Sequence, residues 1–444
     1  MRKIINYLLF ICISHSGFGQ GMNELQTKMD EYIQPIVKTN NFSGTILVSK
    51  NGVILFQKEY GLANRAFGVA TQANTRFHIL SLSKTFTAAA ILMLEQEGKL
   101  STTDLLSKYI PDYPYGEKIT IHHLLAHTSG ITNINDLPIY EQSTMFSHQS
   151  LEALISLFKN QPLEFQPGER YQYSNSNYNL LAYIIEKVSG LSYGNFLSQY
   201  IFKPLAMTST LHHDQMSEMI PNEAVGYVTD SLFGIQKAPY FDWSTKTGNG
   251  SIISTAPDLL KWMQALSKTA LLNDHSKSKM FTLYAESGYG WYIKKLFDRN
   301  CVYMNGRAPG FSAYMAMYGE DKVSVVVLSN IYVPVANRIG IDLVGMVFNQ
   351  PVEPLKLHDS KISQADAKPI KGSYQFGKDF YRPNYVMDVT EKGGYLYTNW
   401  GVLIPEKPSQ FIQRYYWSKV AFKKDSAGVI QMMFDQYRGT KIQK

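Results

Sequence analysis

Two serines and one lysine stand together where an apolar run begins, in FHILSLSKTFTAAAILML at residues 77–94. Residues three apart share one face of a helix, so Ser81 and Lys84 can meet while Ser83 points elsewhere. A serine beside an unprotonated amine can act as a nucleophile, and free N–H groups at a helix start can stabilise an oxyanion. The segment therefore predicts acyl transfer at Ser81 with Lys84 as base. The plain alternative is that Ser81 only caps a helix.

The serine–lysine spacing alone is weak support, because Ser156–Lys159 and Ser276–Lys279 share it. The pKa of a lysine must fall from about 10.4 to near 7, at about 4 kcal/mol, before it serves as a base at neutral pH. Burial lowers a lysine pKa in this way, and Lys84 opens the apolar run AAAILML, whereas SKSK is hydrophilic. We therefore expect the other two pairs to be accidental.

Further motifs follow the serine segment in order: KITIHHLLAHTSGI and then PGERYQYSNSNYNLLAYIIEKVSG. With SLSKTFTAAAILMLEQEGKL, they closely resemble the penicillin-recognising serine hydrolases of the class C β-lactamase type. That superfamily includes D-Ala-D-Ala carboxypeptidases, D-aminopeptidases and family VIII carboxylesterases. The resemblance covers roughly residues 40–350. It implies an α/β fold with an antiparallel sheet flanked by helices, an all-helical lobe, an active site between them, and no cofactor.

The resemblance assigns roles to individual residues. Ser81 matches the acylated nucleophile, Lys84 the base that takes its proton, and Tyr173 the tyrosine that passes a proton to the leaving group. Asn175 matches the amide that hydrogen-bonds substrate. The tyrosine–any–asparagine pattern also occurs at Tyr193, Tyr303 and Tyr397. Only Tyr173 lies between a turn and an amphipathic helix, as the family requires.

The family's third motif is lysine or histidine, any residue, glycine, on a strand at the edge of the cleft. Lys246–Gly248 matches this motif residue by residue. It leads, however, into GNGSIISTAPDLLKW, which resembles the glycine-rich turn and helix that precede the third motif in this family. We therefore expect Lys246 and Thr247 to be dispensable for chemistry. In this family the third motif precedes a Pro-Gly-Phe turn and a hydrophobic strand that ends in Ser-Asn. The residues at that place in this chain are Met304–Gly306.

Met304 stands where relatives carry a cation or an imidazole, and a thioether donates no proton. A hydrogen bond to a substrate carboxylate contributes about 1.5 to 3 kcal/mol, so its loss predicts a bias of about ten- to a hundredfold against carboxylate substrates. Gly306 allows close backbone approach, and the N–H of Arg307 matches the family's second oxyanion donor. The Arg307 side chain is an alternative source of the missing charge.

Histidines offer a weaker set of candidates. His123 and His127 are four apart, a spacing that can bind metal on a helix, but no zinc-protease glutamate accompanies them. We expect no metal there. The pair His212 and His213 has no partner within reach in the sequence, so we expect it at the surface.

The chain ends suggest export and a second domain. Arg2 and Lys3 precede a short apolar stretch, so residues 1–20 read as a signal peptide, with a lipid anchor on Cys12 as a poor alternative. Cys301 is then the only cysteine, so no disulfide can form within the mature chain. Cleavage also lowers the formal charge from +7 to +5 by removing Arg2 and Lys3. That mild charge, without basic runs, does not indicate nucleic-acid binding, and no later segment is apolar enough to span a membrane.

Three further segments follow the signal peptide: a hydrolase domain over residues 21–350, a polar linker over 351–364, and a small all-β domain over 365–444. A strand hairpin is predicted at Asn51-Gly52, and two more lie in the last segment. Helices are expected at about 84–97, 150–160, 177–189 and 256–267.

The sequence leaves three functions open. The leading expectation is an exported serine hydrolase that acylates Ser81, leaning toward esters or neutral peptides because of Met304. The alternative is a D-Ala-D-Ala carboxypeptidase, penicillin-binding protein or β-lactamase in which Arg307 holds a carboxylate. A non-catalytic sensor or scaffold is less expected, since a binder needs no nucleophile, base and tyrosine together. The substrate would be a small molecule or peptide, such as one derived from the cell wall.

Overall fold

The computed structural model describes residues 21–442 except 270, 356, 358, 408 and 427. The predicted signal peptide, residues 1–20, lies outside these described residues. Within the described part of the chain, no helix combines the length and apolarity that a bilayer span requires.

A six-stranded antiparallel sheet forms the centre of the first domain, in the order β10-β11-β12-β13-β1-β2. The predicted hairpin is confirmed, because Asn51 (φ 53°) and Gly52 (φ 79°) form the turn between β1 and β2. Both backbones are left-handed, the conformation that an Asn-Gly turn favours. The strands are β1 (Gly44–Lys50), β2 (Val53–Tyr60), β10 (Tyr292–Leu296), β11 (Arg299–Ala308), β12 (Phe311–Tyr318) and β13 (Val323–Ser329).

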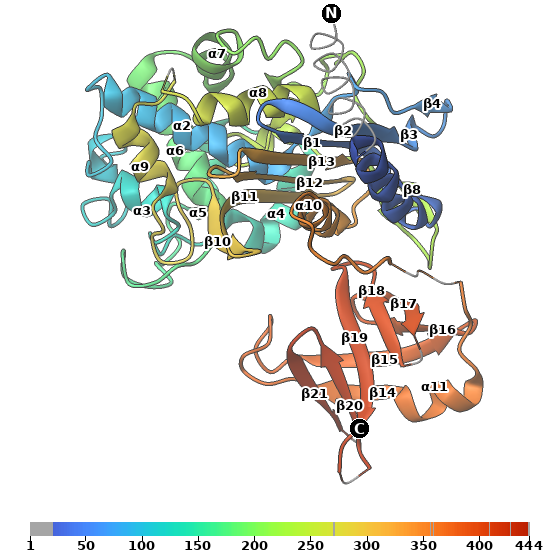
Figure 1. Cartoon of the computed structure of the whole chain (residues 1–444). Helices are drawn as coiled ribbons and strands as arrows, with labels where there is room; N and C mark the ends of the chain where they lie inside the picture. Colours follow the sequence, from blue (N-terminus) through green and yellow to red (C-terminus); the bar gives the residue numbers. More distant parts are fainter. Residues whose placement is uncertain are drawn as a thin grey trace, which may run out of the picture.

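The helices divide between a lobe beside the sheet and covers on its two faces (Figure 1). They are a helix over residues 21–38, α2 (Ser83–Gln96), α3 (Ile121–Leu125), α4 (Pro138–Gln142), α5 (Leu151–Phe158), α6 (Asn175–Ser189), α7 (Tyr193–Leu197), α8 (Ala256–Leu266), α9 (Asp274–Phe281) and α10 (Val335–Val347). A further helix, α11 (Gln364–Ile370), packs against the C-terminal strands instead. The four predicted helices correspond to α2, α5, α6 and α8.

Alternation along β13 explains how the sheet joins two cores. Val325 and Val327 pack in a cluster with the helix over residues 21–38 and with α10. Val326 and Leu328 point the other way, into a cluster that includes α8 and the helical lobe. Because successive side chains of a strand face opposite sides, one strand serves both cores. The predicted α/β architecture with an antiparallel sheet and a helical lobe is confirmed.

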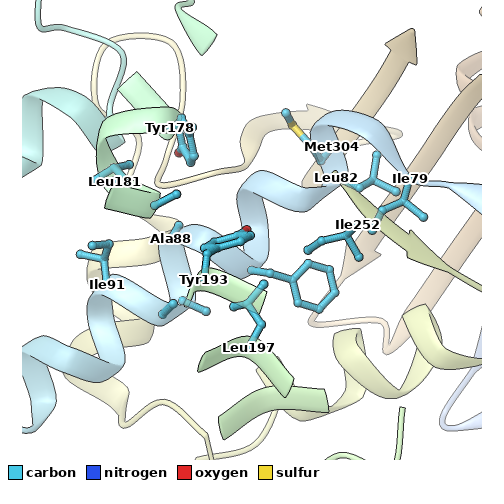
Figure 2. Close-up of a cluster of buried hydrophobic side chains, with 14 of the residues drawn as sticks. Ile79, Leu82, Ala88, Ile91, Tyr178, Leu181, Tyr193, Leu197, Ile252 and Met304 are labelled. Carbon is cyan, nitrogen blue, oxygen red and sulfur yellow. The ribbon is translucent and has the colours of Figure 1, made fainter. Parts of the chain in front are cut away.

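Helix α2 runs through the middle of the lobe and is buried on almost every side. Figure 2 shows its Ala88 and Ile91 among Tyr178 and Leu181 of α6 and residues of α7. The helix begins at Ser83 rather than at Ser81. A 3₁₀ turn over Leu80–Leu82 precedes it, and Leu80 has φ 57°, so the chain bends sharply there before it becomes α-helical.

The C-terminal segment forms a closed antiparallel barrel, which confirms the small all-β domain. Both predicted hairpins are present, as β15–β16 and β19–β20. The strands are β14 (Gly372–Gln375), β15 (Val386–Lys392), β16 (Tyr395–Thr398), β17 (Gly401–Lys407), β18 (Gln410–Gln413), β19 (Ser418–Lys424), β20 (Ile430–Phe434) and β21 (Tyr437–Ile442). The domain limits drawn from the sequence stay predictions.

A buried arginine in the loop between β18 and β19 contributes to the attachment of the barrel to the first domain. Arg414 is 1% exposed. Its guanidinium donates to Asn41 Oδ1 at 2.8 Å and to the carbonyl oxygens of Asn40, Ser231 and Gly234 at 2.9, 2.5 and 2.9 Å. Barrel residues Val402, Ile404 and Ile412 also join the core cluster of the first domain. The docking surface therefore combines apolar packing with a buried, fully engaged cation.

We predict that Arg414→Met lowers the free energy of unfolding by about 3 kcal/mol, because several buried acceptors lose their donor. Thermal unfolding of the full chain measures this. Arg382→Met, at an exposed position of the barrel, is the matched control and should leave the unfolding midpoint nearly unchanged. Equal midpoints for the two variants would contradict the anchoring role of Arg414.

Candidate active site

A cavity of about 400 Å³ lies between the helical lobe, the edge of the central sheet and the barrel. All seven residues singled out from the sequence lie in it or directly behind its wall. Those that line it are Leu80, Ser81, Asn135, Tyr173, Asn175, Trp243, Lys246, Asn249, Gly250, Tyr292, Met304, Asn305, Gly306, Arg307, Ala308, Pro334, Asn337 and Tyr416. Lys84 is fully buried just behind Ser81.

Ser81 sits on the tight turn before α2, with its hydroxyl between two partners. Its Oγ lies 3.2 Å from Lys84 Nζ and 2.8 Å from Tyr173 OH. Ser83 faces away, as predicted, and its hydroxyl accepts from the backbone N–H of Ile252 at 3.2 Å. Ser81 is thus the serine that meets both a lysine and a tyrosine.

The Lys84 amine is held by three oxygen atoms. Besides Ser81 Oγ, it donates to Asn175 Oδ1 at 2.9 Å and to the carbonyl oxygen of Asn249 at 2.8 Å. Burial, and next the positive charge of Lys246, hold the pKa of Lys84 well below its usual range. A neutral amine has two protons for the two amide oxygens, which leaves its lone pair for the Ser81 hydroxyl proton. This arrangement can generate a serine alkoxide.

Tyr173 lies on the loop that enters α6, as the sequence predicted. Burial, and next the neighbouring Tyr292, raise the pKa of its phenol, while the hydrogen bond between Tyr173 and Ser81 lowers it in part. The group is therefore a neutral phenol, which can donate a proton and relay it to a leaving group. The His127 ring packs 4.6 Å from the Tyr173 ring, and its Nδ1 accepts from the backbone N–H of Ser174 at 3.2 Å. His127 therefore fixes the position of the phenol.

The residues predicted to form the third motif, Met304–Gly306, lie on β11 and line the cavity. A Cβ on Gly306 would lie 2.9 Å from Ser81 N and 2.7 Å from Leu80 Cβ, so only glycine lets the strand approach the serine turn this closely. Met304 is 3% exposed and belongs to the buried hydrophobic cluster that Figure 2 shows in part. The thioether therefore fills space at the cavity wall.

Lys246–Gly248 does not lie on this strand, in agreement with the sequence register. A Cβ on Gly248 would lie 2.2 Å from the Tyr178 carbonyl oxygen, so this glycine serves packing against α6. Lys246 nevertheless lines the cavity, and its Nζ donates to Asn135 Oδ1 at 3.2 Å. Asn135 Oδ1 also accepts from Asn175 Nδ2 at 3.0 Å, which links Lys246 to the catalytic network. The expectation that Lys246 is dispensable for chemistry stays a prediction, and this contact gives a reason to test it.

Arg307 extends from β11 toward the barrel. Its guanidinium lies 4.5, 4.6 and 5.0 Å from the ring centres of Tyr332, Tyr415 and Tyr416, and Nη1 donates to the Tyr415 carbonyl oxygen at 2.7 Å. Tyr416 also lines the cavity. The barrel therefore supplies one wall of the site, a contribution that nothing in the sequence pattern indicated.

The remaining candidates lie apart from this site. Lys159 pairs with Asp112, and Lys279 with Glu95 at 2.9 Å, so both lysines of the accidental motifs are ion-paired. His123 caps its own helix through a bond from Thr120 N, whereas His127 lies behind Tyr173. Of the repeated tyrosines, Tyr193 bonds Thr87 under α2 at 2.7 Å, Tyr303 lies on β11 and Tyr397 in the barrel.

Comparison with known proteins agrees with this geometry, since residues 29–344 match the family described as Beta-lactamase. The chain belongs to the β-lactamase family. It is 31% identical over 328 residues to Penicillin-binding protein 4* of Bacillus subtilis, covering 68% of this chain and 71% of that protein. The family membership predicted from the sequence motifs is thus confirmed, and the chain is a serine hydrolase of this family.

Two solved structures extend the comparison. A penicillin-binding protein from Bacillus halodurans is 29% identical with a TM-score of 0.60, covering 67% of this chain and 94% of its own. The octameric penicillin-binding protein homologue from Pyrococcus abyssi is 25% identical with a TM-score of 0.67, covering 94% of this chain and 99% of its own. The second likeness includes the C-terminal barrel as well as the β-lactamase domain.

The charge of Lys246 predicts a pH effect. Activity should fall as the pH drops through the pKa of Lys84, because the protonated amine cannot accept a proton. Lys246→Met removes a positive neighbour that lowers this pKa, so the acidic limb of the kcat/KM profile should move to higher pH. Lys187→Met, at an exposed position, is the control. An acidic limb that stays in place in Lys246→Met would contradict this coupling.

Proposed function

We propose that this protein is an acyl-transfer hydrolase that cleaves an amide or ester through a Ser81 acyl-enzyme. The contact of Ser81 Oγ with both Lys84 Nζ and Tyr173 OH carries the proposal. Lys84 takes the hydroxyl proton as Ser81 attacks the carbonyl carbon, and Tyr173 passes a proton to the leaving group. Water then attacks the acyl-enzyme and releases the acid.

Backbone N–H groups near the serine turn form a candidate binding site for the oxyanion. The N–H of Ser81 and that of Arg307 lie on the two segments that Gly306 brings together. Two N–H donors aimed at a developing oxyanion stabilise the tetrahedral intermediate, and one such donor contributes about 3 kcal/mol. Asn175 is engaged with Lys84 and Asn135, so it orients the base as well as lining the substrate cavity.

We further propose that the substrate carries a carboxylate. Lys84, Lys246 and Arg307 surround the cavity, and none of the described residues lining it is an aspartate or glutamate. With Lys84 neutral as the base, Lys246 and Arg307 remain as cations near the substrate. A site with this charge attracts an anion. The resemblance to D-Ala-D-Ala carboxypeptidases leads us to favour a peptide ending in a D-amino acid carboxylate as the substrate class.

A second candidate function is hydrolysis of neutral esters or amidated peptides. Met304 favours it, because the thioether replaces the donor that relatives direct at a carboxylate. The two candidates differ in one measurable ratio, the preference between a free and a blocked carboxylate.

Export also remains a proposal, supported by Arg2, Lys3 and the apolar stretch that follows them. N-terminal sequencing of the protein recovered from the cell envelope tests it, and an intact Met1 would contradict cleavage.

Labelling the chain with a fluorophosphonate, followed by peptide mass mapping, tests the nucleophile. We expect the adduct on Ser81, loss of labelling in Ser81→Ala, and retention in Ser83→Ala, whose hydroxyl bonds only backbone. An adduct on Ser83, Ser156 or Ser276 would refute the assignment.

The carboxylate preference is measured with a matched pair of substrates, N-acetyl-D-Ala-D-Ala as the free acid and as its C-terminal amide. We expect the acid to have the higher kcat/KM, by about ten- to a hundredfold, and the ratio to shrink in Lys246→Met and in Arg307→Met. Met304→Lys should increase it. A wild-type preference for the amide would replace this proposal with the neutral-substrate candidate.

A further inference from the structure

Three groups of the kind that bind transition metals gather on the far side of Trp243 from the cavity. They are His78, His213 and Glu223, and one ligand atom from each lies within 4.8 Å of the others. His213 was expected at the surface, but it is 1% exposed, as is His78. The expectation failed because it considered neighbours in the sequence, whereas both partners of His213 come from distant segments.

The local topology explains the juxtaposition. His78 ends β5 (Phe77–His78), which pairs with one edge of β9 (Ile252–Ser254). His213 follows β6 (Leu211–His212), which pairs with the other edge of β9, and the N–H of His213 donates to Ser251 O at 2.9 Å. Glu223 arrives on the opposite side of β5, where it forms a bridge with Arg76.

The hydrogen bond of the His213 ring leaves one nitrogen lone pair without a partner. His213 Nε2 lies 3.1 Å from the Gln215 carbonyl oxygen, an acceptor only, so Nε2 carries the proton and Nδ1 the lone pair. Within the described chain, His213 Nδ1 is buried and has no hydrogen-bond partner. A buried ring nitrogen without a partner is unfavourable unless something fills the place beside it.

We propose that His78, His213 and Glu223 bind a divalent transition-metal ion of the zinc type. Two imidazoles and one carboxylate form a common zinc ligand set, and a ligating histidine typically donates its other N–H to a backbone carbonyl, as His213 does to Gln215. The Glu223 side chain is 31% exposed, which gives the ion a path from solvent and leaves a coordination position for water.

The distances set how the groups must move. Ligand atoms around a tetrahedral zinc lie about 3.4 Å apart, as follows from zinc–ligand bonds of about 2.1 Å. His78 Nε2 and Glu223 Oε1 are 3.0 Å apart, in a hydrogen bond that breaks when both atoms ligate the ion, as the ring proton moves to Nδ1. The wider separations therefore close by rotation of the partly exposed Glu223 side chain and small shifts of the two rings.

The site would act on the cavity by positioning rather than by chemistry. The His78 ring stacks on Trp243 with centres 3.7 Å apart, and Trp243 lines the cavity. His78 also precedes Ser81 by three residues, on the strand that leads into the serine turn. An ion at this place would hold that strand and the Trp243 wall together.

Isothermal titration of zinc into chelator-stripped full-length protein tests the proposal. We expect one equivalent to bind and the thermal unfolding midpoint to rise with zinc. Glu223→Gln keeps the shape of the side chain and an acceptor for His78, and should weaken zinc binding at least about tenfold. His213→Ala should do the same, whereas His275→Ala, at an exposed position, should bind as the wild type does.

A second readout is independent of folding and of hydrolytic activity. Cobalt bound at the site should give a visible absorption spectrum that is lost in Glu223→Gln, provided the zinc-free variant unfolds at the wild-type midpoint. Zinc or cobalt binding that is absent in the wild type, or unchanged in a folded Glu223→Gln, would overturn the proposal. Neither result depends on the identity of the substrate, so the acyl-transfer proposal stands or falls separately.

Discussion

Burial of the Lys84 amine is the constraint on which the rest of the site depends. A lysine in water is protonated and useless as a base, and only a dry, well-filled lobe lowers its pKa enough. Helix α2 achieves this by being apolar on nearly every side, so that α6, α7 and α8 close around it. The amine then needs polar partners, and two amide oxygens supply them without adding a negative charge that would restore the proton.

The same low-polarity setting explains why the polar network is so fully connected. Tyr173, Ser81, Lys84, Asn175, Asn135 and Lys246 form, in this order, a chain of hydrogen bonds at the border between dry core and cavity. Each group holds its neighbour in place, because a buried polar atom without a partner lowers the stability of the folded protein by about 1–3 kcal/mol. Leu80 has a left-handed backbone with φ 57°, which is strained for a leucine and holds Ser81 at the cavity.

Much of this arrangement could be predicted from the sequence. The serine–lysine pair followed from helical periodicity, Tyr173 and Gly306 from motif order, and the hairpins and barrel from alternation and turn residues. These signals are local, or they belong to an ordered set of motifs. Asn135 and Asn249 gave no such signal, since a loop amide becomes informative only when folding places it beside the amine.

The features that the sequence did not reveal also have physical reasons. Lys246–Gly248 lies outside the cleft strand, as the motif register predicted, but the lysine side chain is long enough to reach the cavity from a neighbouring turn. His213 looked unpartnered because its neighbours lie on strands that pair through β9. Tyr416 could not be anticipated, because docking between two domains leaves no periodic trace in either of them.

That docking separates the enzyme's two tasks between two independently cored modules. The hydrolase domain holds the reacting serine, its base and its proton relay, while the barrel has its own apolar interior and lends Tyr416 to the cavity wall. Substitutions at Tyr416 can therefore change what fits beside Ser81 without disturbing the dry lobe that lowers the pKa of Lys84. The shape of the cavity thus depends partly on a domain that takes no part in the reaction at Ser81.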